Sequence, residues 1–160
     1  ITEMKRFQSR LQKVHDILQQ QCRMAELEFA RARAQLSAAE QKVEQAIEEF
    51  HAARQDVRSA LSTTQQISAI LVMQQHLDAA QSGIQKRKTE RDQAEQVCQQ
   101  ARQKYQSIHS QVERIEKLIE KQREEHHQEM LKGHQQTLDD VALFRWNAAE
   151  RETKEVNFHG

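Results

Sequence analysis

The feature that most constrains this sequence is a heptad repeat of apolar residues in its first third. Large apolar residues recur every seven positions from Cys22, and alanines recur every seven positions from Ala25. The members are Cys22, Phe29, Leu36, Val43, Phe50 and Val57 in the first series, and Ala25, Ala32, Ala39, Ala46, Ala53 and Ala60 in the second. Together they alternate spacings of three and four, which predicts the a/d seam of a coiled coil.

Alanine at every second seam position favours a close, antiparallel pairing of two helices. An alanine side chain offers almost no knob, whereas parallel dimers usually combine a β-branched residue with leucine. A second seam follows in the same chain, formed by Leu77, Ala80, Ile84, Ala94, Cys98, Ala101, Tyr105, Ile108, Val112, Ile115 and Ile119, with Arg87 and Arg91 interrupting it. The two seams therefore predict that the chain pairs with itself.

Between the two seams lie Ser62, Thr63 and Thr64. Serine and threonine are unfavourable in the interior of a helix, but their hydroxyl groups stabilise its N-terminus by capping free backbone amides. The sequence thus predicts an all-α fold in which two long helices form an antiparallel coiled-coil hairpin. We expect helix over 3–61, a turn at 62–64, a longer second helix over 65–152 and a frayed tail over 153–160.

Upstream of the repeat, Phe7, Leu11, Val14 and Leu18 are one residue out of phase, which predicts a local stutter. Folding back at Thr63 pairs residues whose numbers add up to about 126, so that Leu11 faces Ile115. The last ~25 residues of the second helix then have no partner within the chain. Cys22 and Cys98 would lie about 9 Å apart along the axis, so we expect free thiols.

The composition argues against several classes of function. The chain has no proline, three glycines, 4% aromatic residues, and 24 basic against 24 acidic residues. It lacks a glycine-rich phosphate loop and a cleft in which a catalytic pair could be tuned. It also lacks the basic stripe and stacking aromatics of nucleic-acid binders, and the mixed charges and narrow seam disfavour a membrane-surface helix. We expect no enzymatic activity, no cofactor, no nucleic acid and no direct membrane insertion.

Three clusters are candidate sites. His126, His127 and His134 have the wrong spacing to share a metal ion on one helix face, so a solvated polar face is the better interpretation. The basic run from Lys86 to Arg91 fits either a solvated face or contact with an acidic partner. The segment 138–146 holds the only tryptophan and an arginine, residue types that are enriched in interface hot spots. We favour partner docking there over packing on the N-terminal turn.

Three segments carry a resemblance to a known family. They are Lys5 to Val14, the alternating seam to Val57, and Glu116-Lys117-Leu118-Ile119-Glu120-Lys121 followed by Leu138-Asp139-Asp140-Val141-Ala142. The sequence resembles the FliJ family of bacterial flagellar export proteins, whose relatives in virulence injectisomes are the YscO-type proteins. Asp140 stands where the family usually has glutamate.

The resemblance implies a non-enzymatic central stalk of a type III export ATPase, located in the cytoplasm at the inner-membrane export apparatus. The paired chain ends would enter the hexameric ring, while the other end of the hairpin would face the cytoplasmic domain of the export gate. The protein would also handle export chaperones. On this basis the predicted ATPase contacts are Phe7, Leu11, Leu138, Val141, Phe144, Arg145 and Trp146.

The family's gate-binding positions fall at His76, Ala80, Gly83 and Arg87. His76 is neither aromatic nor aliphatic, and Ala80 is small where leucine is usual, so this chain departs from the family pattern there. Flagellar and injectisome systems both stay open. The alternative function is a generic coiled-coil scaffold that dimerises and bridges partner proteins.

Overall fold

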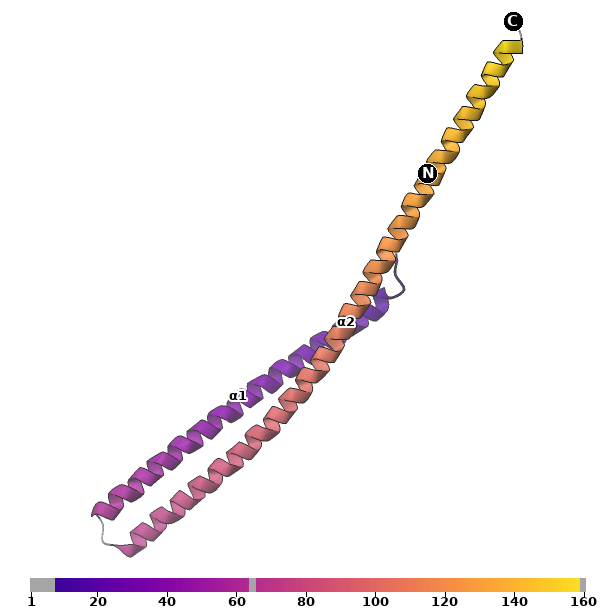
Figure 1. The fold of residues 1–160 in the computed structure, drawn as a ribbon. Helices are drawn as coiled ribbons and strands as arrows, with labels where there is room; N and C mark the ends of the chain where they lie inside the picture. The colour runs from indigo at the N-terminus through magenta and orange to yellow at the C-terminus, as the bar shows by residue number, and fades with distance from the viewer. Residues whose placement is uncertain (1–7, 64–65, 159–160) are drawn as a thin grey trace. The chain divides into compact units, whose positions relative to one another are not determined.

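In the computed structural model, two long α-helices account for the fold, and no strand occurs in the described residues, 8–63 and 66–158. Helix α1 spans Gln12–Thr63 and helix α2 spans Ile67–Phe158 (Figure 1). The predicted all-α hairpin with a longer second helix is confirmed. The chain divides into two compact units, Ile17–Val112 and the pair of segments Ile1–Asp16 with Glu113–Gly160.

Within the unit Ile17–Val112, α1 and α2 run antiparallel. Lys104 Nζ donates to Glu28 Oε2 at 2.8 Å, and the rings of Phe29 and Tyr105 stack with centroids 6.3 Å apart. The residue numbers add up to 132 for the first pair and 134 for the second. The predicted pairing, about 126, is therefore wrong by about six residues.

Most of the displacement of the pairing has its origin at the end of α1. Ser62 Oγ and Thr63 Oγ1 both donate to the carbonyl of Ser59, at 2.7 and 3.0 Å. These hydroxyls bond back into α1 instead of capping α2, so α1 continues to Thr63 and the connection to Ile67 falls later than predicted. Thr64 lies outside the described residues.

The seam of this unit is the predicted one. Every member of the two α1 series is buried or half-buried, and so are the predicted α2 positions from Leu77 to Val112. Ala25 is 1% exposed and Ala32 is 4% exposed. Because alanine lets the helices approach closely, these small side chains become the most buried points of the seam. Cys22 is half-buried and Cys98 is buried, and both are free thiols.

In the unit of Ile1–Asp16 and Glu113–Gly160, α1 begins at Gln12 and not at residue 3. Ser9 ends the non-helical segment: its Oγ accepts from the Leu11 amide at 3.2 Å, and its carbonyl accepts from the Gln12 amide at 3.2 Å. Its hydroxyl also donates to Gln122 Oε1 at 2.7 Å, which holds the start of α1 against α2. The predicted start lies outside the described residues, but residues 8–11 are not helical.

The seam position in this unit belongs to His15, and the predicted stutter through Val14 is wrong. His15 is half-buried, whereas Val14 is 43% exposed. His15 Nε2 lies 3.0 Å from Glu116 Oε1 on α2, and this polar contact holds the imidazole at the interface. Residues 11, 15, 18 and 22 alternate spacings of four and three, so the heptad phase continues without interruption.

The hydrogen bond to Glu116, with Asp16 adding to it, raises the pKa of His15 above its ordinary value of 6.5. A raised pKa means that the contact stabilises this unit fully below pH 6.5 and that the contribution is lost as pH rises through the folded-state pKa. We expect Glu116→Gln to lower the melting temperature more at pH 5.5 than at pH 8. Nuclear magnetic resonance titration of His15 checks the cause, and a midpoint at or below 6.5 would contradict it.

Helix α2 extends beyond its predicted end. The predicted frayed tail over 153–160 is helical through Phe158. Thr153 Oγ1 donates to the carbonyls of Ala149 and Glu150 at 3.1 and 2.9 Å, and Lys154 Nζ lies 3.2 Å from Glu150 Oε1. These local contacts, with no proline in the sequence, let the helix continue past residue 152.

Candidate partner-binding surfaces

The final part of α2 carries the largest group of exposed apolar side chains. Every side chain from Leu131 to Lys154 is exposed. Phe144 is 77% exposed and Trp146 is 71% exposed. Apart from Leu11 and Phe7, all predicted ATPase contacts lie here, namely Leu138, Val141, Phe144, Arg145 and Trp146. Leu11 is half-buried at the start of α1, and Phe7 lies outside the described residues.

These apolar side chains surround the helix. Residues of an α-helix advance by about 100° each, so Phe144 and Trp146 point about 160° apart. Around the axis the order is Leu143, Trp146, Leu138, Val141 and Phe144, with no gap above about 100°. All five are exposed in the structure. Exposed apolar side chains therefore occur on every side of this segment, with the charged side chains of Asp139, Asp140 and Arg145 between them.

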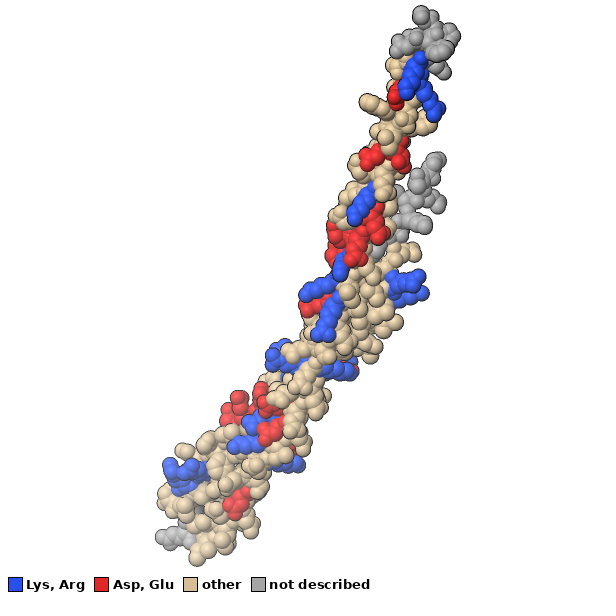
Figure 2. All heavy atoms as spheres, turned by 45° about the vertical axis from the view of Figure 1, so that its right-hand side comes forward, with Lys and Arg blue, Asp and Glu red and all other residues tan. Residues whose placement is uncertain are grey.

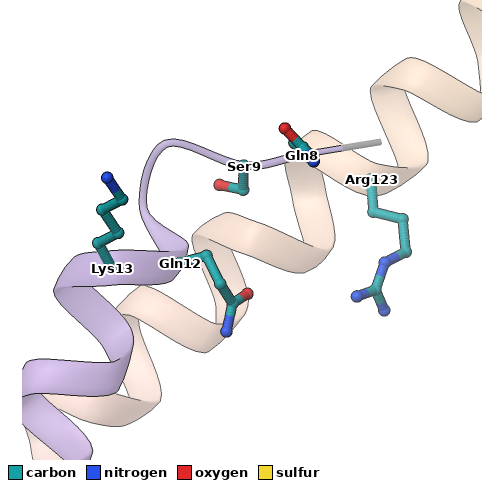
Figure 3. Close-up of a pocket in the computed structure, with 5 residues that line it drawn as sticks. All are labelled: Gln8, Ser9, Gln12, Lys13 and Arg123. Carbon is teal, nitrogen blue, oxygen red and sulfur yellow. The ribbon is translucent and has the colours of Figure 1, made fainter. Parts of the chain in front are cut away.

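A hollow of about 400 Å³ lies where α1 begins (Figure 3). It is lined by Gln8, Ser9, Gln12, Lys13 and Arg123. Figure 3 shows that the side chains of Lys13 and Arg123 point away from each other. Arg123 Nη1 also donates to Glu120 Oε2 on its own helix at 3.0 Å. Because its two cations do not converge, the hollow lacks the arrangement needed to hold a small anion.

The predicted gate contacts His76, Ala80, Gly83 and Arg87 lie in one stripe of α2, in the unit Ile17–Val112. Their spacings of four, three and four keep them on one helix face. His76 is exposed, whereas the other three are half-buried. The structure therefore brings these residues together, but most of the stripe coincides with the seam that faces α1.

The arginines of the basic run are paired on α2 itself. Arg87 Nη1 lies 2.9 Å from Glu90 Oε2, and Arg91 Nη2 lies 2.7 Å from Asp92 Oδ1. The bond from Arg87 holds the pKa of Glu90 below its ordinary value, and the bond to Asp92 raises the pKa of Arg91. On the face in Figure 2, basic and acidic side chains interleave. This surface has no single-sign stripe of the kind that attracts nucleic acid.

A substitution at Gly83 tests how closely α1 packs against the gate stripe. A Cβ built at this position meets no atom within 4 Å. Alanine is favoured over glycine in a helix interior by about 1 kcal/mol, so we expect Gly83→Ala to raise the free energy of unfolding by about that amount. The matched control, Ala80→Gly, should lower it similarly in urea denaturation. Destabilisation by Gly83→Ala would show that α1 packs more closely on this position than the structure indicates.

Two further classes of site find no support in the described part of the chain. Residues 8–63 and 66–158 hold no group of three or more His, Cys, Asp or Glu side chains that could bind a metal ion. Neither described helix contains a stretch long and apolar enough to cross a membrane.

One family match covers the paired part of the two helices, the segment 138–146 and the gate stripe. Residues 7–151 match the family model described as Flagellar FliJ protein. The chain belongs to the FliJ family. FliJ is a family of structural stalk proteins associated with the flagellar export apparatus, and its match includes every predicted ATPase and gate position. No curated protein and no solved structure shows a significant match to the chain.

Proposed function

We propose that this FliJ-family chain is the central stalk of a type III export ATPase, with its paired chain ends, including the exposed part of α2, inserted into the hexameric ring. The single observation that supports insertion is the distribution of the apolar side chains around residues 138–146. Trp146, Phe144 and Leu143 point in different directions, yet all are exposed. A partner that touches one side of α2 would leave some of them in water, whereas a ring covers them all.

The proposed stalk acts on the ring because different sides of α2 carry different side chains. A ligand shifts a conformational equilibrium only through contacts that differ between the states. Around α2 the ring subunits would meet unlike groups: an indole at Trp146, a guanidinium at Arg145 and a phenyl ring at Phe144. Such unlike contacts would favour different conformations in different subunits, and the chain would need no catalytic group of its own.

The other contacts in the proposal involve the hairpin unit. The stripe of His76, Ala80, Gly83 and Arg87 would contact the cytoplasmic domain of the export gate, with export chaperones as further partners. His76 is exposed and the remaining three are half-buried. The gate would therefore bind along the edge of the helix pair and not on an open face of α2.

The test is to mix the full chain with the cognate hexameric export ATPase and to follow phosphate release. We expect stimulation that saturates at one chain per hexamer, because one chain fills the pore of one ring. No change in phosphate release, together with a stable dimer of the chain by light scattering, would instead support the alternative of a dimerising scaffold.

A further inference from the structure

Polar contacts hold the start of α1 against α2. The Ser9 hydroxyl donates to Gln122 Oε1 at 2.7 Å, and His15 Nε2 lies 3.0 Å from Glu116 Oε1. All four residues belong to the same compact unit of the chain. The hairpin unit, in contrast, is joined by a continuous seam of apolar side chains. We refer to residues 8–16, which carry the two polar contacts, as the N-terminal segment.

The helix itself does little to stabilise the N-terminal segment. The first turn of α1 contains no acidic residue, which would interact favourably with the positive end of the helix dipole. Lys13 instead places a positive charge there. Helix ends with few buried apolar contacts open locally at a much lower free-energy cost than the core of a structure. Closure of this segment therefore depends on the contacts that it makes with α2.

Opening of the N-terminal segment would change the surface of α2. Because Ser9 bonds to Gln122 and His15 contacts Glu116, the part of α2 between these two positions faces the segment. Ile119 lies in this part and is only 7% exposed. Separation of the segment from α2 would therefore add the side chain of Ile119 to the apolar surface that α2 offers to a partner.

The protonation state of His15 changes the strength of this interface. The charged groups that act on the imidazole are Glu116 on α2 and Asp16 on α1. Its Nδ1 is buried, has no hydrogen-bond partner among the residues that the structure describes, and lies 3.5 Å from Asp16 Oδ1. A neutral imidazole that donates from Nε2 leaves this nitrogen as an unpaired acceptor, whereas a protonated one is attracted by both carboxylates. Contact with α2 therefore favours the protonated form.

We propose that the N-terminal segment opens and closes on α2 as a local unit, and that protonation of His15 favours the closed form. In the closed form Ser9 and His15 bond to α2 and Ile119 is covered. In the open form these contacts are lost and Ile119 is accessible to water or to a partner. The seam of the hairpin unit is the same in both forms.

The direction of the pH dependence follows from the same contacts. The hydrogen bond to Glu116 outweighs the cost of burial and raises the pKa of His15 above 6.5. The extra stability of the closed form is therefore complete below pH 6.5 and is lost as the pH rises through the raised pKa. This proposal goes beyond the stalk function and does not depend on ring insertion.

Hydrogen exchange of the full chain, followed by nuclear magnetic resonance, tests the local opening. The His15 amide donates to the Leu11 carbonyl at 2.8 Å, and this bond is lost when the start of α1 unfolds. Its protection factor, which is corrected for the intrinsic pH dependence of exchange, should fall several-fold from pH 5.5 to pH 8.5. By linkage, the fall approaches the ratio of the proton dissociation constants of His15 in the open and closed forms. The amides of Ala25 and Ala32 should show no such fall.

Two substitutions separate the effect of charge from that of packing. Glu116→Gln removes the carboxylate that His15 contacts and should remove most of the pH dependence of protection. His15→Leu places an apolar side chain in the seam, so the segment should stay protected at both pH values. The matched control, Glu124→Gln, replaces a carboxylate of α2 that bonds to Gln128 on its own helix, and the fall should remain.

Three results would overturn the proposal. The first is equal protection of the His15 amide at both pH values in the wild type. The second is an undiminished fall in the Glu116→Gln variant. The third is an equal fall at Ala25 and Ala32, because the start of α1 would then not open separately from the hairpin unit.

Discussion

Replacing Phe144 and Trp146 together with alanine is expected to weaken binding to the export ATPase by about a hundredfold or more. In the proposed complex both side chains leave water on insertion, and truncating a buried aromatic anchor at an interface typically costs about 2 kcal/mol or more. The two residues point to opposite sides of α2, so the variant loses contacts with different ring subunits. Binding is measured by titration of the labelled chain, and stimulation by phosphate release.

The matched control replaces Met24 and Leu27 with alanine. These residues lie on α1 in the hairpin unit, and Met24 is 64% exposed. Their loss should change neither ATPase binding nor helicity by circular dichroism. If the Phe144→Ala, Trp146→Ala variant stimulates the ATPase as the wild type does, the assigned ring contacts are wrong.

The second large effect is expected at the seam. Ala25→Leu adds three carbons at a position that is 1% exposed between α1 and α2. Overpacking of a close interface typically costs about 1–3 kcal/mol, so we expect the free energy of unfolding to fall by about 2 kcal/mol. Urea denaturation followed by circular dichroism measures this change.

Ala34→Leu is the control for this substitution, because the same change is made at an exposed position of the same helix. Its effect should stay within about 0.5 kcal/mol. Equal stability of the two variants would mean that Ala25 does not lie between closely packed helices.

The seam of the hairpin could be predicted because it depends on periodicity alone. The spacing from Cys22 to Ala60 fixes which face of α1 is apolar, whatever the length of the turn. The register of the pairing depends on the position of the turn. The hydroxyl groups there can either cap the N-terminus of α2 or bond back to a carbonyl of α1, and the sequence alone does not distinguish these two roles. Ser62 and Thr63 bond back to the Ser59 carbonyl and the connection falls about two residues later than predicted, which moves the sum of the paired residue numbers by about four of the observed six or more.

His15 was missed because a pattern of apolar residues does not register a histidine. Val14 fits a seam by composition, but His15 reaches Glu116 across the interface and keeps the spacing of four and three. The spacing from Leu11 to His15 to Leu18 was visible in the sequence. Recognising it required the partner on α2, which only the three-dimensional pairing supplies.

The surfaces were predictable in part. The aromatic residues identify the segment 138–146, but the predicted contacts do not include Leu143, whose exposed side chain lies between Trp146 and Phe144 around the helix. The gate stripe came only from family resemblance, and the structure adds that three of its four residues face the seam.

The most direct test of ring insertion is photo-crosslinking from single positions around α2. A photoreactive residue is placed in turn at Leu138, Leu143, Phe144 and Trp146, and at Met24 as a control, in the complex with the export ATPase. The proposed stalk predicts crosslinks to the ATPase from all four positions and none from Met24. Crosslinks from one side of α2 alone would contradict an enclosing ring and would indicate docking on an open surface.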